Sequence, residues 1–249
     1  MAMVQRIEVS DGTIIAYERT PGKGPGVIFL GGFMSDMTGS KATALEAHCR
    51  SSGRAFVRFD YLGHGQSSGA VRDGTIGRWL EDSLLVFDRL TEGAQIVIGS
   101  SMGSWLALLL TLARPDRVKA LIGIGSAPDF TRELMWPNFS EDEKRQLLSN
   151  GFITQPSYYS PDPYVISYRL IEEADRHLLL NSEIAIDCPV RLYHGLLDHD
   201  VPWQLAHRLM ERLRAEDVTL TLVKNGDHRL SSPADITRLI AEVDALAVL

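Results

Sequence analysis

The sequence predicts a single α/β domain, residues 1–249, with a mostly parallel eight-stranded sheet, helices on both faces and a small helical insertion. Three observations support this prediction. Short, continuously apolar segments alternate with helical patterns over most of the chain. A hairpin near the amino terminus starts the sheet in the antiparallel sense. The chain has 249 residues, 45% hydrophobic and 23% charged, which suits one large core.

The first two strands are expected at Val4–Val9 and Thr13–Arg19, because Asp11-Gly12 between them is a typical two-residue hairpin turn. The later strands are expected at Val27–Leu30, Ala55–Tyr61, Ala94–Gly99, Val118–Gly125, Val190–His194 and Val218–Val223. The helical patterns between them cover Gly39–Ser51, Ile76–Leu90, Met102–Ala113, Trp203–Arg214 and Ala234–Leu246.

One segment, residues 129–187, lacks this alternation and is interpreted as a cap insertion within the domain. A capping box at Ser140–Glu143 starts one helix, Asn150-Gly151 ends it, and a second helix is expected over Tyr164–His177. The aromatic residues of the insertion either line an acyl pocket or form its own core. They are Trp136, Phe139, Phe152, Tyr158, Tyr159, Tyr164 and Tyr168.

Composition excludes several classes of function. A net charge of −7 with scattered basic residues leaves no basic face for nucleic acid. No apolar stretch approaches the roughly 20 residues that span a bilayer, so stable membrane insertion is not expected. The first residues lack the features of a signal or transit peptide, and a cytoplasmic location is expected. Cys49 and Cys188 fit no disulfide framework or zinc spacing and are expected to be buried thiols.

The segment Gly99-x-Ser101-x-Gly103 lies between a predicted strand and a predicted helix, the context of a nucleophile elbow. Only Ser101 is at its centre. The glycines allow a sharp turn that exposes the serine hydroxyl, and Ser100 and Ser104 are interpreted as small packing residues. Ser101 is therefore the candidate nucleophile.

An acid and a histidine follow in the expected chain order. Asp198 and Asp200 both follow a predicted strand, and the spacing favours Asp198, while Asp200 is expected to cap the helix after Pro202. His228, in the loop before the last helix, is the candidate base that takes the Ser101 proton.

The other histidines fit this role less well. His194 ends a strand and has no acid in the required later position, and His64 is interpreted as a structural residue of a turn near the site.

Two backbone amides are the candidate oxyanion donors. Met102 begins the helix after Ser101, where unpaired N–H groups face outward. Phe33 follows Gly31-Gly32 in the loop after an early strand, where two glycines allow close approach to a substrate; a plain tight turn is the alternative.

These motifs, in this order, resemble the α/β-hydrolase superfamily across essentially the whole chain. More narrowly, several short segments resemble the branch of a mitochondrial palmitoyl-protein thioesterase that also hydrolyses acyl glucuronides. These segments are Gly32–Ala42, Arg58–Tyr61, Gly99–Leu106, Ala113–Pro115, Cys188–Leu192, His194-Gly195, Asp198, Val201–Trp203 and Asp227–Arg229. One departure is Ser104, where this branch often has glycine.

The resemblance implies a serine hydrolase of acyl thioesters or oxygen esters, with Ser101, Asp198 and His228 as its triad and an acyl-enzyme intermediate. It implies neither cofactor nor metal, and its partner is a small-molecule ester or an acyl thioester, including acylated protein. A cytoplasmic, bacterial-type member is expected. A general carboxylesterase of small esters and a non-catalytic binding protein of the same fold remain the alternatives.

Overall fold

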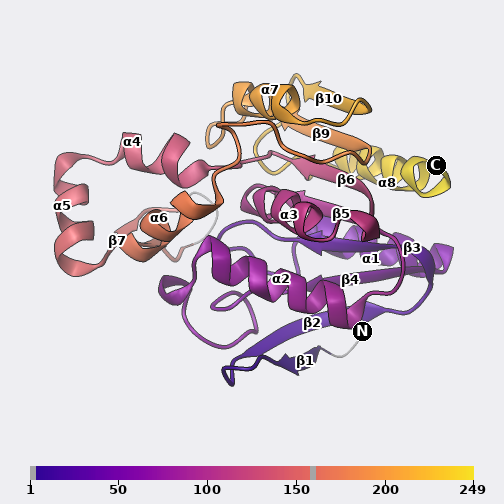
Figure 1. Ribbon diagram of the computed structural model, residues 1–249, viewed down its shortest axis with the longest axis horizontal. Coiled ribbons are helices and arrows are strands. Elements are labelled where there is room, and N and C mark those ends of the chain that lie inside the picture. The colour runs from indigo at the N-terminus through magenta and orange to yellow at the C-terminus, as the bar shows by residue number, and fades with distance from the viewer. Residues whose placement is uncertain (1–3, 158–160) are drawn as a thin grey trace.

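The computed structural model describes residues 4–157 and 161–249 (Figure 1). Its main sheet has eight strands in the order β1-β2-β4-β3-β5-β6-β9-β10. The pairs β1–β2 and β2–β4 are antiparallel and all other pairs in this sheet are parallel. These strands are β1 (Gln5–Glu8), β2 (Ile14–Thr20), β3 (Lys23–Leu30), β4 (Arg54–Phe59), β5 (Gln95–Ser100), β6 (Val118–Ile124), β9 (Val190–Gly195) and β10 (Val218–Val223). The predicted sheet is confirmed.

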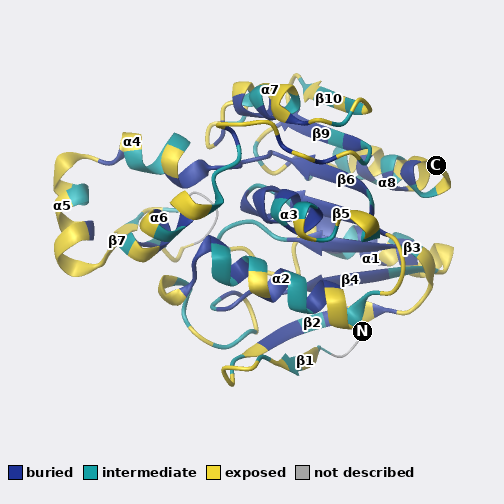
Figure 2. Cartoon of the chain, in the orientation of Figure 1, coloured by how far each residue is buried: buried dark blue, intermediate teal, exposed yellow. Residues whose placement is uncertain are grey.

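Helices cover both faces of this sheet, because alternate strand residues point to opposite sides. On one face α2 (Ile76–Leu90), α3 (Met102–Ala113) and α7 (Trp203–Arg212) bury Trp79, Trp105 and Leu209 in one core cluster. On the other face α1 (Ser40–Ser52) and α8 (Pro233–Val248) form a second cluster with strand residues such as Ile96 and Ile98. Figure 2 shows the central strands of the sheet buried and the edge strands β1 and β10 more exposed.

Between β6 and β9 the chain forms a smaller group of elements, at the left of Figure 1. They are a π-helical turn (Thr131–Met135), α4 (Trp136–Asn138), α5 (Glu141–Asn150), the antiparallel pair β7 (Phe152–Gln155) and β8 (Tyr164–Ser167), and α6 (Tyr168–Ala174). The predicted capping box of α5 is present, and Gly151 ends that helix in the left-handed conformation.

The predicted second helix of this segment is wrong at its start. Residues 164–167 pair with β7 as a strand, and α6 begins only at Tyr168. The reason is local: Val165 and Ile166 are β-branched, and the Ser167 hydroxyl accepts the Leu170 N–H and so caps the helix at that point.

The aromatic residues of this segment mostly form its own core. Phe139 is buried there, and Trp136, Tyr164 and Tyr168 pack against the same cluster, whereas Phe152 is exposed. Phe33 of the main domain packs against this cluster too, with its ring stacked on Tyr164 at 5.9 Å. Two further candidates, at positions 158 and 159 of the sequence, lie outside the described residues.

The two ends of the segment are joined by a buried carboxylate. Asp129 accepts hydrogen bonds from the backbone amides of Leu179 and Leu180 at 2.8–3.0 Å, so it holds the incoming and outgoing chains together. No helix in the described part of the chain is long and apolar enough to cross a membrane.

Candidate active site

Ser101 lies at the sharp turn between β5 and α3. Its φ of 55° and ψ of −122° are strained for a residue with a side chain. The flanking glycines are required sterically: a Cβ on Gly99 would lie 2.3 Å from the Gly103 carbonyl oxygen, and one on Gly103 would lie 2.2 Å from that of Leu30. The turn therefore tolerates no side chain at either glycine.

Ser104 makes two hydrogen bonds in addition to its packing contacts. Its hydroxyl donates a 2.7 Å hydrogen bond to the Ser101 carbonyl and accepts one of 3.3 Å from the Ala127 amide. Ser104 thereby ties the turn to the loop after β6. The spacing of the motif gave no signal for this role, because Ala127 is 23 residues away.

The structure brings Ser101, His228 and Asp198 into one hydrogen-bonded chain. The Ser101 hydroxyl lies 3.0 Å from Nε2 of His228, and Nδ1 of the same ring lies 2.7 Å from Oδ2 of Asp198. This geometry requires the proton of the neutral ring on Nδ1, which leaves Nε2 free to accept from the serine. Residues 127 and 30 positions apart in the sequence meet here.

The side chain of Asp198 is only 1% exposed, and both of its oxygens are hydrogen-bonded. Its Oδ1 accepts from the backbone amides of Asp200 at 2.9 Å and Val201 at 2.8 Å. Burial alone would raise the pKa of this carboxyl, but the hydrogen bonds from His194 and His228 outweigh it and hold the pKa well below its ordinary value. Asp198 therefore stays ionised at neutral pH.

The expected capping role of Asp200 is wrong. The N-cap position of α7 is occupied by Pro202, whose side chain makes no capping hydrogen bond. Asp198 instead binds the amides of this turn, so the carboxylate that organises the loop is the one that faces His228.

The contact between His194 and Asp198 was not predicted from the sequence. It is fully buried at the end of β9, and its Nε2 lies 3.1 Å from Oδ2 of Asp198 and 2.9 Å from the Val201 carbonyl oxygen. The chain order of the motif does not reveal this contact, because it forms when the loop folds back over its own strand. The i,i+4 spacing of a histidine and an aspartate was the available signal.

The loop after β3 lies beside the elbow. A Cβ on Gly32 would be 3.4 Å from that of Ser101. Met34, which has a left-handed φ of 54°, donates its amide to Nε2 of buried His64 at 3.0 Å. In contrast, the amides of Phe33 and Met102 donate to no other described residue.

The loop that carries His228 is held from α1. Lys41, only 8% exposed, donates from Nζ to the Arg229 carbonyl oxygen and to the Ser231 hydroxyl. Burial lowers the pKa of Lys41 to about 8. A buried ammonium thus fixes the backbone next to His228.

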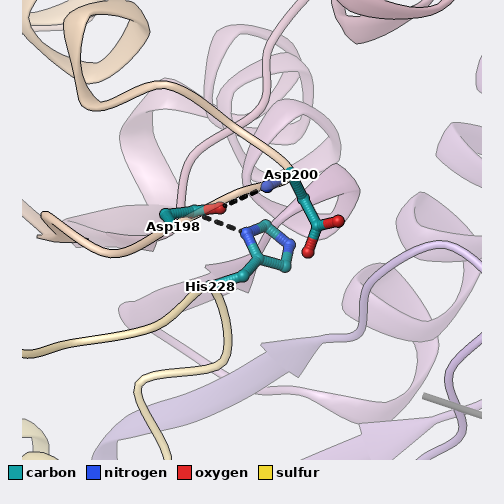
Figure 3. A group of neighbouring side chains, drawn as sticks. All are labelled: Asp198, Asp200 and His228. Carbon is teal, nitrogen blue, oxygen red and sulfur yellow. Dashed lines mark hydrogen bonds and ion pairs between the residues drawn. The ribbon is translucent and has the colours of Figure 1, made fainter. Parts of the chain in front are cut away.

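One group of side chains in the described residues has the composition of a metal site. Asp198, Asp200 and His228 offer ligand atoms within 4.8 Å of one another, and Figure 3 shows the Asp200 carboxylate beside the His228 ring. Both ring nitrogens are already hydrogen-bonded, to Asp198 and to Ser101, so a metal would have to displace one of these bonds. The His228 ring thus lies between a hydroxyl and a carboxylate.

The two cysteines lie away from this site. Cys49 is buried as predicted, but Cys188 is only half-buried. Burial raises the pKa of the Cys49 thiol to about 12 and that of Cys188 to about 11, so both are protonated at neutral pH.

Comparisons with known proteins agree with the fold. The family described as "alpha/beta hydrolase fold" matches residues 25–160. The protein from Mus musculus named "Palmitoyl-protein thioesterase ABHD10, mitochondrial" is 44% identical over 233 residues, which are 93% of this chain and 78% of that protein. The Homo sapiens protein of the same name is 41% identical, with 93% of this chain and 76% of that protein covered.

Two solved structures are similar over nearly the whole chain. The mouse alpha/beta hydrolase domain-containing protein 10 has a TM-score of 0.89, with 41% identity and 98% of both chains covered. A putative hydrolase from Agrobacterium vitis has a TM-score of 0.94, with 41% identity and 99% of both chains covered. The resemblance inferred from the sequence is confirmed.

The expected cytoplasmic location is contradicted, because these relatives are named as mitochondrial proteins. That prediction rested on the composition of a few residues. A folded α/β domain has the same core and the same site in either compartment, so composition was a poor guide to location.

Proposed function

Since the chain belongs to the α/β hydrolase family and is a hydrolase similar to the ABHD10 proteins, we propose a specific reaction for it. The chain cleaves long-chain acyl thioesters and related esters through an acyl-enzyme on Ser101. The observation that carries this proposal is the hydrogen-bonded chain from Ser101 through His228 to Asp198, beside two amides without partners in the described residues. The thioester substrate is proposed because the ABHD10 relatives are named palmitoyl-protein thioesterases.

In the proposed first step, Ser101 attacks the acyl carbonyl while its proton passes to Nε2 of His228. The ionised Asp198 holds the Nδ1–H tautomer and stabilises the imidazolium that forms. The imidazolium then protonates the leaving thiolate or alkoxide, and water activated by the same ring releases the acid. Each proton taken from a nucleophile is thus returned to a leaving group.

The negative charge on the carbonyl oxygen is held by the proposed oxyanion donors, the amides of Phe33 and Met102. Met102 begins α3, so the helix dipole also favours an anion at this position. The neighbouring amide of Met34 is already bonded to His64, whereas the amide of Phe33 donates to no described residue. No cofactor takes part in this proposal.

The segment 129–187 is proposed as a cap that shapes the acyl site. Its strand β8 packs directly on the loop after β3, which carries the proposed donor Phe33. Tyr164 stacks on Phe33, and the Val165 amide lies 3.3 Å from the Met34 sulfur. An apolar acyl chain that leaves Ser101 on this side would meet aromatic side chains.

The test is a chain-length series of matched substrates, acetyl to palmitoyl, as S-acyl thioesters and as oxygen esters. The proposal expects kcat/KM to rise with chain length for the thioesters, because each buried methylene contributes binding, about 0.8 kcal/mol when fully buried. A preference confined to acetyl oxygen esters would instead identify a carboxylesterase of small molecules. No turnover of any member would leave only a binding function.

A further inference from the structure

One ring nitrogen of His194 contacts the candidate site, and the other is buried away from it. Its Nε2 faces two acceptors, the Val201 carbonyl oxygen at 2.9 Å and Oδ2 of Asp198 at 3.1 Å. Its Nδ1 is buried and has no hydrogen-bond partner in the described part of the chain. A proton on Nε2 satisfies both acceptors, whereas a second proton on Nδ1 would bury an unpaired donor and a charge. The geometry therefore indicates a neutral ring with its proton on Nε2.

With this tautomer, all four acceptor positions of the Asp198 carboxylate are occupied. Two backbone amides bind Oδ1, and two imidazoles, His194 and His228, bind Oδ2. The carboxylate cannot rotate toward His228 or away from it without losing a buried hydrogen bond. Its negative charge is also shared between the two rings.

We propose that His194 is a positioning residue for the hydrolysis proposed above: its Nε2–H bond to Asp198 orients the carboxylate and limits the negative charge that Asp198 presents to His228. This inference rests on the proposed function. His194 reaches the reacting atoms only through Asp198 and His228, so it neither accepts the serine proton nor contacts the substrate.

The charged residues around His228 come from three parts of the chain. Asp198 and Asp200 lie in the loop after β9, and Asp227 and Arg229 flank His228 in its own loop, which Lys41 of α1 binds through the Arg229 carbonyl. Substitution of His194 leaves all of these in place. It removes only one donor from Asp198, so the full carboxylate charge then acts on His228 and raises its affinity for a proton.

The experiment compares pH profiles of kcat/KM for wild type, His194→Leu and His194→Gln on one thioester. Leucine fills a similar volume without a donor, and glutamine can place an amide N–H near the position of Nε2. The acidic limb is expected to move up by about half a unit to one unit in H194L, which reduces activity at pH 7 by at most about three- to tenfold. In H194Q the limb is expected to return to the wild-type position. His48→Leu is a matched control, because the half-buried His48 of α1 pairs with Asp244 of α8 and not with Asp198.

A merely structural role would lower the melting temperature of both variants and leave the acidic limb unchanged. An unchanged limb in active H194L, or equal shifts in H194L and H194Q, would overturn the proposal. Should H194L fail to fold, long-range ¹H–¹⁵N NMR spectra of wild type decide the question. The neutral Nε2–H tautomer of His194 that its contacts favour is expected at pH 7, and an Nδ1–H tautomer or an imidazolium would overturn the proposal. A wild type that hydrolyses no ester would remove the proposed function and leave this NMR test standing.

Discussion

The backbone amide of Met34 donates a 3.0 Å hydrogen bond to Nε2 of His64, a ring that is itself buried and donates from Nδ1 to the Leu62 carbonyl at 3.1 Å. This pair of bonds fixes the neutral tautomer of His64. It also engages the Met34 amide, whereas the Phe33 amide donates to no described residue.

This contact makes stability depend on pH. Burial lowers the pKa of His64 to about 4, from an ordinary value of 6.5. Between these values the unfolded chain binds more protons than the folded one, so this contribution to stability is present above pH 6.5 and is lost as the pH falls toward 4. Between pH 7 and 4.5, wild type should lose about 2 kcal/mol more free energy of unfolding than His64→Gln, which cannot titrate. Urea unfolding at both pH values measures the difference, and equal losses in the two proteins would contradict it.

Substitutions of the two aspartates in the loop after β9 should differ in how far they lower kcat. Asp198→Asn removes the charge that stabilises the His228 imidazolium and favours the wrong tautomer, so kcat should fall about 10³- to 10⁴-fold. Asp200→Asn changes an exposed side chain and should cost less than about tenfold, because solvent screens its charge. Steady-state kinetics on one ester measures both, and a larger loss in D200N than in D198N would contradict the assignment of Asp198.

Gly103→Ala should destabilise the fold itself. The new Cβ would lie 2.2 Å from the Leu30 carbonyl oxygen, a rigid backbone atom, so β3 and α3 must move apart. Overpacking of this kind costs about 1–3 kcal/mol or more. Gly39→Ala is the control, because its Cβ would meet nothing closer than 3.7 Å. Thermal unfolding compares the two, and equal melting temperatures would show that the turn can relax.

Lys41→Met should reduce kcat about tenfold with little change in KM, because loss of the bond to the Arg229 carbonyl loosens the position of His228. Lys23→Met, at the exposed start of β3, is the control for loss of a positive charge. Wild-type kinetics in K41M would show that the loop is held without the ammonium.

The parts of the site that the sequence predicts are those whose signal is local. Ser101 lies between flanking glycines at a strand-to-helix turn, and Asp198 and His228 each follow a strand, so pattern and chain order suffice to select them. Helix starts with a capping box, such as that of α5, are equally local.

The features that were missed depend on contacts between distant segments or on weak local preferences. The bond of Ser104 to Ala127, and that of His64 to Met34, form only when separate loops fold together. The contact of His194 with Asp198 depends on a loop that folds back on its strand. The strand at 164–167 is only four residues long and pairs with one other short strand, too little for periodicity to distinguish it from a helix start.

The central claim is that Ser101 is the nucleophile, and labelling with a fluorophosphonate probe tests it most directly. Wild type and Ser100→Ala should be labelled, with the probe on the peptide that contains Ser101, and Ser101→Ala should lose both labelling and ester hydrolysis while it keeps the wild-type melting temperature to within a few degrees. Undiminished labelling of S101A would contradict the account.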